Sequence, residues 1–546
     1  MDARRLLSDL TPAQRDAVTH GRGPLLVLAG AGSGKTRVIT RRVAYLISQG
    51  IDPRSILAIT FTNKAAGEMA ERIEVLTSGA RVWVSTFHSF CARTLRRYAR
   101  WVGIDPRFSI LDQSDSLVAV REALQETGTD PKLYGAPKVL AAIAAEKDRL
   151  RTPEQTQADA CSQFEASVAR AYAYYQDLLA QSDAVDFSDL LVKTVELLRI
   201  EEVGAVLRDR FRYLLIDEYQ DTNHVQYELV RLLGQEHRNV CATGDPDQSI
   251  YGWRGADIAN ILRFEQDYPE ARVVKLEENF RSTGHILAAA NGLIRHNTER
   301  REKELRTAGP EGEPLRYRIH HDDHDEARYV ARAVVERVVG DGVPRSEVAV
   351  FYRTGACSRA LETAFQERGI PYRVVGSLAF YQRREIKDVL CYLRVIHNPR
   401  DDVALQRVIN VPPRGIGKQT LGRLRARARR ESCSLYEACR LLAAEGALKG
   451  RSREGMRSLL DLVEGLQALA AQETAVEELI RRLLEETRYR EYLVRTFPRD
   501  EEDRLLNLAS LLAGARDFDR RFALRGPDAR TTSPAPPPPR TNGEDT

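Results

Sequence analysis

The sequence has little net charge and no long apolar run. Its 546 residues carry a net charge of only +4, so any nucleic-acid binding must come from a local surface rather than from bulk charge. No apolar run is long enough to span a bilayer, and the first five residues lack the apolar core of a signal peptide. We therefore expect no membrane contact and a cytoplasmic protein.

Cysteine is also scarce, with seven residues that form no CxxC pair and no cluster with metal-ligand spacing. This pattern predicts small buried side chains in a reducing compartment. With 43% hydrophobic and 29% charged residues, the composition is that of a globular protein long enough for several domains. The cysteines are Cys91, Cys161, Cys241, Cys357, Cys391, Cys433 and Cys439.

One stretch near the N-terminus has the pattern of a phosphate-binding loop. The apolar run 25–29 predicts a buried strand, and a glycine-rich turn then leads to Lys35 and Thr36 at the start of a predicted helix. Glycines let successive N–H groups surround phosphate oxygens, and the helix N-terminus adds partial positive charge. Lys35 can reach the β and γ phosphates, and the Thr36 hydroxyl can bind Mg²⁺.

The predicted nucleotide-binding loop consists of Ala29, Gly30, Ala31, Gly32, Ser33, Gly34, Lys35, Thr36 and Arg37. Ala29 stands where the strict pattern has glycine, which leaves the three glycines to shape the turn. A chance glycine turn in a doubly wound fold is the alternative. The Lys-Thr pair and the flanking apolar run favour the nucleotide site.

Two adjacent carboxylates, Asp217 and Glu218, follow the apolar run 213–216. Asp217 can hold Mg²⁺ through water, and Glu218 can polarise the attacking water as a general base. An isolated Asp-Glu pair usually faces solvent. Its position after a predicted strand, downstream of a phosphate loop, instead favours a catalytic pair.

Other predicted strands, at 56–61, 82–85 and 240–244, end in aromatic, hydroxyl and basic side chains. Ligand-binding groups of open α/β sheets gather at the carboxyl ends of strands, and this mixture suits a single nucleic-acid strand. Ordinary packing is the alternative for Phe61 and His88, and a buried core position is the alternative for Trp253. The candidate contacts to such a strand are Phe61, Asn63, Thr86, His88, Trp253 and Arg254.

Four further side chains are candidates for contact with a nucleotide. Gln14 follows a predicted helix start at Thr11 and can offer its amide to an adenine edge, although alone it would be a surface glutamine. Gln248 can sense the γ-phosphate or the water. Phe280 can stack on adenine, and Arg281 can stabilise charge on a transferring phosphoryl group.

Taken together, these motifs resemble those of superfamily 1 DNA helicases of the UvrD/PcrA/Rep type. The most specific strings are Asp-Glu-Tyr-Gln-Asp-Thr-Asn at 217–223 and Gly-Asp-Pro-Asp-Gln-Ser-Ile-Tyr-Gly-Trp-Arg-Gly-Ala at 244–256. The resemblance covers roughly residues 8 to 525. It implies an α/β fold with two RecA-like P-loop motor domains, each carrying a helical insertion, with ATP between the motors and single-stranded DNA across them.

The resemblance also implies a role for individual residues. Gln14 matches the adenine-reading glutamine, and Gln248 matches a coupling glutamine. Phe280 matches the aromatic residue that stacks on adenine, and Arg281 matches one arginine finger. Gly415, Gly417 and Lys418 resemble a duplex-contacting loop in the second insertion, with a plain helix–helix turn as the alternative.

We expect six segments. Residues 1–110 and 201–275 form the first motor domain, 111–200 a helical insertion, 276–376 an incomplete second motor domain, 377–525 a second helical insertion, and 526–546 a disordered Pro-rich tail. Candidate strands of the second motor lie at 315–319, 348–352 and 372–375. The last two helicase motifs of the family are absent, so we expect a truncated or frameshifted product whose second motor leaves apolar side chains unpaired.

The leading hypothesis is an ATP-dependent 3′→5′ DNA helicase in repair or replication restart, using ATP and Mg²⁺. Its expected partners are single-stranded DNA, junctions between single- and double-stranded DNA, and repair proteins. The alternative is a truncated fragment that binds ATP and DNA without coupled unwinding. A P-loop enzyme with a small-molecule substrate is less favoured, because it leaves Phe61, His88 and Trp253 without a role.

Overall fold

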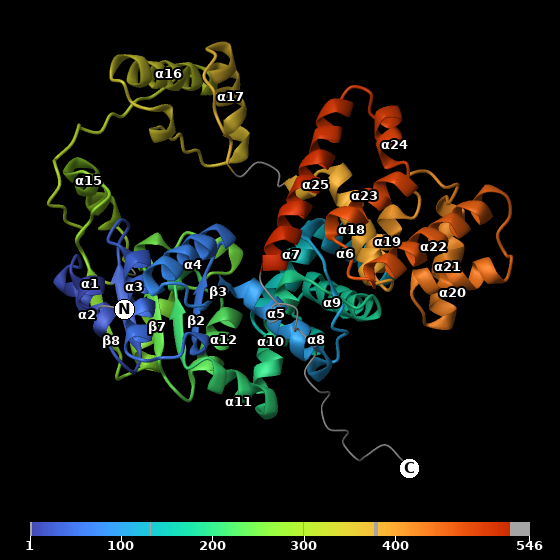
Figure 1. Cartoon of the computed structure of the whole chain (residues 1–546), viewed down its shortest axis with the longest axis horizontal. Helices are drawn as coiled ribbons and strands as arrows, with labels where there is room; N and C mark the ends of the chain where they lie inside the picture. The colour runs from blue at the N-terminus through green and yellow to red at the C-terminus, as the bar shows by residue number, and fades with distance from the viewer. Residues whose placement is uncertain (1–2, 131–132, 299, 376–379, 525–546) are drawn as a thin grey trace.

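A computed structural model describes residues 3–130, 133–298, 300–375 and 380–524 (Figure 1). The predicted Pro-rich tail at 526–546 lies outside these residues. No helix within the described ranges is both long and apolar enough to cross a membrane. Figure 1 shows a sheet domain on one side, a large helical region on the other, and helices α16 (Asp323–Val335) and α17 (Ser358–Glu367) standing apart from both.

The sheet domain contains six parallel strands in the order β3-β2-β6-β7-β1-β8. Its central strands are buried on both faces, which is why they appear in the sequence as continuous apolar runs. The expected α/β fold class is confirmed. The strands are β1 (Leu25–Ala29), β2 (Ile56–Thr60), β3 (Trp83–Thr86), β6 (Tyr213–Ile216), β7 (Val240–Gly244) and β8 (Arg272–Leu276).

Helices cover both faces of this sheet. On one face, α3 (Lys35–Ser48) and α4 (Asn63–Thr77) pack on β1 and β2. On the other, α5 (Phe87–Tyr98), α10 (Phe187–Arg199) and α12 (His224–Gly234) complete a larger core. The short α2 (Pro12–Thr19) begins at a capping box in which the Thr11 hydroxyl accepts a hydrogen bond from the Gln14 backbone N–H.

The first helical region consists mainly of α6 (Gln113–Glu126), α7 (Ala136–Asp148), α8 (Pro153–Ala158) and α9 (Gln163–Gln181). The two-stranded ladder of β4 (Ser109–Ile110) and β5 (Ala184–Val185) closes it. Then α11 (Glu201–Arg210) leads into β6. The region has its own apolar core.

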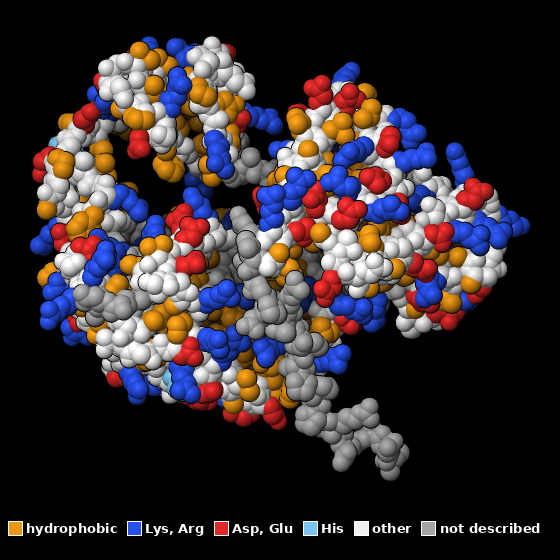
Figure 2. Space-filling model, viewed as in Figure 1, with side chains coloured by type: hydrophobic (Ala, Val, Ile, Leu, Met, Phe, Trp, Pro, Cys, Tyr) orange, Lys and Arg blue, Asp and Glu red, His pale blue; other side chains and the backbone are white. Residues whose placement is uncertain are grey.

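The three strands predicted at 315–319, 348–352 and 372–375 are wrong in this structure. Among the described residues 277–375 there are helices α15 (Gly284–Ile294), α16 (Asp323–Val335) and α17 (Ser358–Glu367), but no strand. No other described segment forms a β-ladder with these three stretches, so their alternating apolar side chains stay exposed. Tyr317 is 87% exposed and Phe351 is 93% exposed. Figure 2 shows that side chains do not close the opening between α16, α17 and the sheet domain.

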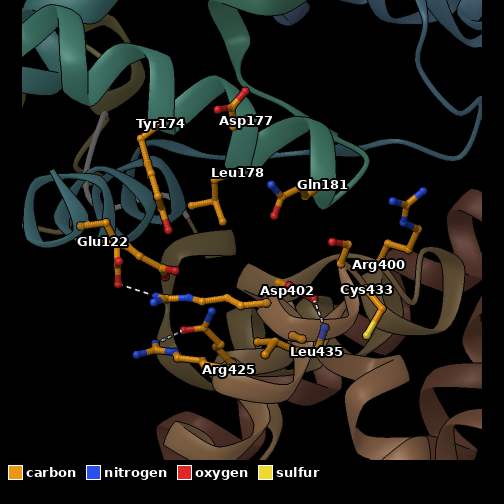
Figure 3. Close-up of a pocket in the computed structure, with 15 residues that line it drawn as sticks. Glu122, Tyr174, Asp177, Leu178, Gln181, Arg400, Asp402, Arg425, Cys433 and Leu435 are labelled. Carbon is orange, nitrogen blue, oxygen red and sulfur yellow. Dashed lines mark hydrogen bonds and ion pairs between the residues drawn. The ribbon is translucent and has the colours of Figure 1, made fainter.

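The second helical region runs from α18 (Arg384–His397) to α25 (Glu501–Leu524) around a large apolar core. Between them lie α19 (Asp402–Val408), α20 (Lys418–Glu431), α21 (Leu435–Ala444), α22 (Arg451–Ala470), α23 (Val476–Glu486) and α24 (Tyr489–Thr496). This region contacts the first helical region through Lys387, which pairs with Asp112 and Asp115 at 2.7 Å. A cavity of about 400 Å³ lies between the two regions, lined by Glu122 and Tyr174 on one side and Asp402 on the other (Figure 3).

The cysteines differ in part from the expectation. Cys91, Cys241, Cys391 and Cys439 are buried and Cys433 is half-buried, but Cys161 and Cys357 are exposed. All seven are free thiols, in keeping with the absence of paired spacing in the sequence. The two exposed residues lie just before α9 and just before α17, where no core is available to cover them.

Candidate active site

The predicted motifs meet at one edge of the sheet. The loop 30–34 follows β1, Asp217 follows β6, residues 245–248 follow β7 and residues 277–282 follow β8. Because β1 lies between β7 and β8, the segments after those two strands flank the phosphate loop, and Asp217 lies one strand farther along, beyond β7. This is the edge where ligand-binding groups of open parallel sheets collect.

The phosphate loop depends on its glycines. Gly32 and Gly34 adopt left-handed backbone angles, with φ of 71° and 91°. A Cβ on Gly32 would lie 2.7 Å from the Arg281 Cβ, and one on Gly30 would lie 2.3 Å from a Leu305 methyl. The loop is therefore closely packed by the chain that follows β8, and at Gly32 both the backbone angle and the Arg281 contact require glycine.

Lys35 begins α3 and faces the carboxylate pair. Its Nζ lies 3.4 Å from Glu218 Oε2, and the Lys35 side chain is only 10% exposed. Gln220 donates from Nε2 to the same Glu218 carboxylate at 3.0 Å. The predicted phosphate-binding lysine and the predicted general base thus lie together, with Gln220 fixing the base.

Asp217 is buried beside Glu218. Burial, and then the Glu218 charge, raise the pKa of Asp217 to about 7. Burial likewise raises the pKa of Asp221 to about 6. The described residues contain no group of three or more metal-binding side chains, so the protein offers only a few oxygen ligands here. That donor set fits Mg²⁺, which keeps several waters and binds substrate phosphates, and Thr36 and Asp217 would hold it.

Gln248 is held by a neighbouring carboxylate. Its Nε2 donates to Asp245 Oδ2 at 2.5 Å, and the Asp245 backbone N–H donates to Gln220 Oε1 at 3.0 Å. A continuous set of polar contacts therefore runs from Lys35 through Glu218 and Gln220 to Asp245 and Gln248.

Gln14 is buried against the phosphate loop. Its Nε2 donates to the Ser33 carbonyl at 2.9 Å, and its Oε1 accepts from the Thr11 N–H at 3.3 Å. In this structure the amide supports the loop, and its role toward adenine stays a prediction. Arg37 pairs with Asp9, and its contact with nucleotide also stays a prediction.

Residues 277–282 are fastened to the phosphate loop. Asn279 Nδ2 donates to the Ala31 carbonyl at 2.6 Å, and the Phe280 N–H donates to the Gly32 carbonyl at 2.9 Å. The Phe280 ring is 57% exposed, and Arg281 follows it directly. The predicted adenine-stacking ring and the predicted arginine finger therefore stand beside the loop.

The candidate DNA contacts after β2 and β3 lie farther along the same edge. Phe61 packs edge-on against Phe87, and His88 packs edge-on against Phe187, with ring centroids 5.7 Å apart in the second pair. Burial lowers the pKa of His88, which favours the neutral ring. Thr86 caps α5 by accepting from the Ser89 N–H. Asn63 is exposed at the start of α4.

Trp253 lies on the surface, so the alternative of a buried core tryptophan is wrong. Its side chain is 69% exposed, and the Arg254 guanidinium carbon lies 4.5 Å from the ring centroid. An exposed ring beside a cation is an arrangement suited to stacking on a base next to a phosphate.

The third group of candidate DNA contacts lies on the second helical region. Gly415 has φ of 75°, and its carbonyl accepts from the Ser452 hydroxyl at 2.8 Å. Gly417 caps α20 with open space around its Cα, and Lys418 is exposed. Open backbone next to a lysine is compatible with phosphate contact.

Comparison with known proteins identifies the family. The model of the UvrD/REP helicase N-terminal domain matches residues 10–269, and that of the UvrD-like helicase C-terminal domain matches residues 274–440. The chain belongs to the UvrD-like helicase family. The ATP-dependent DNA helicase PcrA of Staphylococcus epidermidis is 42% identical over 525 residues, which cover 95% of this chain and 71% of that protein. PcrA of Staphylococcus aureus is 41% identical over the same shares.

Sequence reasoning missed three residues that organise this helicase site. Asn279 and Gln220 lie inside the recognised motifs, but the sequence does not distinguish an amide that holds a loop by hydrogen bonds from an exposed amide. Lys303 is buried at the same edge and pairs with Asp245 and Asp247. It stands in a run of alternating basic and acidic residues at 300–306 that looks like a solvated surface.

Proposed function

We propose that this protein is an ATP-dependent DNA helicase. The observation that carries the proposal is the meeting of Lys35, Glu218 and Gln248 at one sheet edge in a chain whose relatives are named ATP-dependent DNA helicases. ATP is the proposed nucleotide and DNA the proposed partner. A 3′→5′ direction, junction DNA and repair proteins remain predictions from the resemblance. A cytoplasmic location remains a prediction from the cysteine pattern and the N-terminal sequence.

In the proposed reaction, ATP binds with its phosphates in the loop 30–34 and along the N-terminus of α3. Lys35 leaves the Glu218 carboxylate for the β and γ phosphates, which frees Glu218 to take a proton from the attacking water. Gln220 keeps that carboxylate oriented. Arg281 stabilises charge on the transferring phosphoryl group, because its planar, positively charged guanidinium presents several N–H donors to phosphoryl oxygens.

When bound, Mg²⁺ would neutralise charge on the β and γ phosphates, held by Thr36 and Asp217. Ionised Asp217 is the form that suits this role. Since burial raises the pKa of Asp217 to about 7, a nearby cation is the interaction that would shift the group back toward its charged form.

DNA is proposed to cross the strand ends of β2 and β3 and to reach Trp253. Gln248 and Trp253 belong to one loop after β7, so a change at the γ-phosphate can move the base-stacking ring directly. This short connection would couple ATP hydrolysis at Gln248 to DNA binding at Trp253.

A strand-displacement assay tests the proposal. Purified protein, ATP and Mg²⁺ are mixed with a labelled duplex that carries a 3′ or a 5′ single-stranded tail. We expect the wild type to separate the strands of the 3′-tailed duplex, and Lys35→Ala to lose this activity. ATP and DNA binding without displacement or DNA-stimulated hydrolysis would instead support the alternative of a binding fragment.

A further inference from the structure

Residues 300–306, here called the strap, lie across the carboxyl edge of the sheet. Lys275 Nζ donates to the Glu302 carbonyl at 2.8 Å, and the Arg306 N–H donates to the Glu277 carbonyl at 2.8 Å. The Leu305 side chain packs against Gly30 of the phosphate loop. The strap is therefore fixed beside the nucleotide site, even though it comes after helix α15.

Lys303 points from the strap into the loop after β7. Its Nζ pairs with Asp245 Oδ1 and Asp247 Oδ2, and its side chain is only 5% exposed. Arg300 adds a contact of 3.2 Å to Asp247. Both aspartates are themselves at least nine-tenths buried, so the strap supplies the countercharge that they need inside the protein.

The same Asp245 carboxylate holds Gln248. Lys303 binds Oδ1, whereas Gln248 Nε2 donates to Oδ2. The Asp247 N–H also donates to Asp245 Oδ1, at 3.0 Å. Lys303 therefore fixes the rotamer of the carboxylate that orients Gln248, and does so without contacting Gln248.

We propose that Lys303 is a positioning residue that sets Gln248 for ATP hydrolysis through Asp245. The inference rests on the proposed function for its effect on turnover. Because the strap leads on to α16 and α17, it also connects that region to the γ-phosphate side of the site. A buried ion pair that serves stability alone is the competing account.

Lys303→Met tests the proposal, because it keeps the length and apolar stem but removes the charge. Hydrogen exchange of peptides covering residues 245–249 should accelerate about tenfold, since the Asp247 and Gln248 amides depend on a fixed Asp245. The ATPase kcat should fall at least about tenfold while KM for ATP changes by less than about twofold. Lys303→Arg should recover part of both properties.

Arg301→Met is the matched control on the same strap. Arg301 pairs with Glu265 and the Leu262 carbonyl, away from Asp245, so this variant should leave exchange at 245–249 and kcat unchanged. In the Gln248→Ala background, Lys303→Met should cause no further loss of kcat, because both changes act through one amide.

The two hypotheses fail in different ways. Wild-type protein without any ATP hydrolysis contradicts the proposed function, and the exchange measurement still decides the role of Lys303. Unchanged exchange at 245–249 in Lys303→Met, or a fall in stability with kcat intact, overturns the positioning role.

Discussion

Asn279 joins the segment after β8 to the phosphate loop: its side-chain amide donates to the Ala31 carbonyl at 2.6 Å. The other end of the same amide accepts from the backbone N–H groups of Arg281 and Ser282. One buried side chain therefore fixes both the phosphate loop and the turn that presents Phe280 and Arg281. The proposed adenine stack and arginine finger depend on this contact.

Asn279→Ala should lower both stability and nucleotide affinity. The change removes three hydrogen bonds to partly buried backbone groups, which costs about 2 kcal/mol of unfolding free energy. It also loosens Phe280, so KM for ATP should rise. Urea unfolding and steady-state kinetics measure the two effects.

Asn239→Ala is the control for Asn279→Ala. Asn239 makes comparable backbone contacts, to Gly23 and Arg212, at the opposite end of the strands. The Asn239→Ala variant should be less stable than the wild type, while its KM for ATP is unchanged. An equal rise in KM in both variants would contradict a specific role for Asn279.

Glu218→Gln should separate binding from hydrolysis. Removing a general base lowers kcat by roughly 10²- to 10⁴-fold. ATP binding should persist or tighten, because Lys35 loses its competing carboxylate partner. Lys35→Ala should instead weaken binding itself. Equilibrium binding of a fluorescent ATP analogue, alongside phosphate release, distinguishes the two variants, and equal loss of binding in both would argue against these roles.

Trp253→Ala should weaken binding of single-stranded DNA. Stacking of one base on an aromatic ring contributes about 1–3 kcal/mol. Trp253→Phe keeps a ring and should retain most of the affinity. Fluorescence anisotropy with a labelled oligonucleotide at one fixed salt concentration measures this. Unchanged affinity in Trp253→Ala would remove this ring from the DNA path.

Asp402 should make stability pH-dependent. It lines the cavity between the two helical regions (Figure 3), and burial raises its pKa to about 7, with Asp401 and Glu122 adding to the rise. The folded state then holds a proton that the unfolded state releases nearer its ordinary value. This contribution to stability is present at low pH and is lost as pH rises from about 4 to about 7.

Asp402→Asn removes that titration while keeping an acceptor for the Leu435 N–H. The variant should be more stable than wild type at about pH 8, with the difference shrinking toward about pH 4. Thermal unfolding across this range measures it. A constant difference at every pH would show that Asp402 does not titrate as described.

The sequence was sufficient for the first sheet because its strands are buried on both faces and stand directly before their motifs. Lys35, Asp217 and Glu218 could be assigned because strand ends of a parallel sheet share one edge. For the strands predicted at 315–319, 348–352 and 372–375, the sequence pattern could not show whether a partner strand is present. Alternation indicates that a segment suits a ladder, not that a partner strand is available.

The supporting contacts were beyond sequence reasoning for a different reason. Asn279, Gln220 and Lys303 act through long-range geometry, and each has the residue type of an ordinary surface position. Gln14 illustrates the same limit. Its position was predicted, yet its amide braces Ser33 and Thr11, a detail that only the structure supplies.

The decisive measurement for a DNA-coupled motor is ATP hydrolysis with and without single-stranded DNA, in wild type, Lys35→Ala and Glu218→Gln. We expect DNA to stimulate hydrolysis in the wild type and both variants to lose hydrolysis, with ATP binding retained, among the two variants, only in Glu218→Gln. Hydrolysis that DNA leaves unchanged, or that survives in Glu218→Gln, would contradict a DNA-coupled motor at this site.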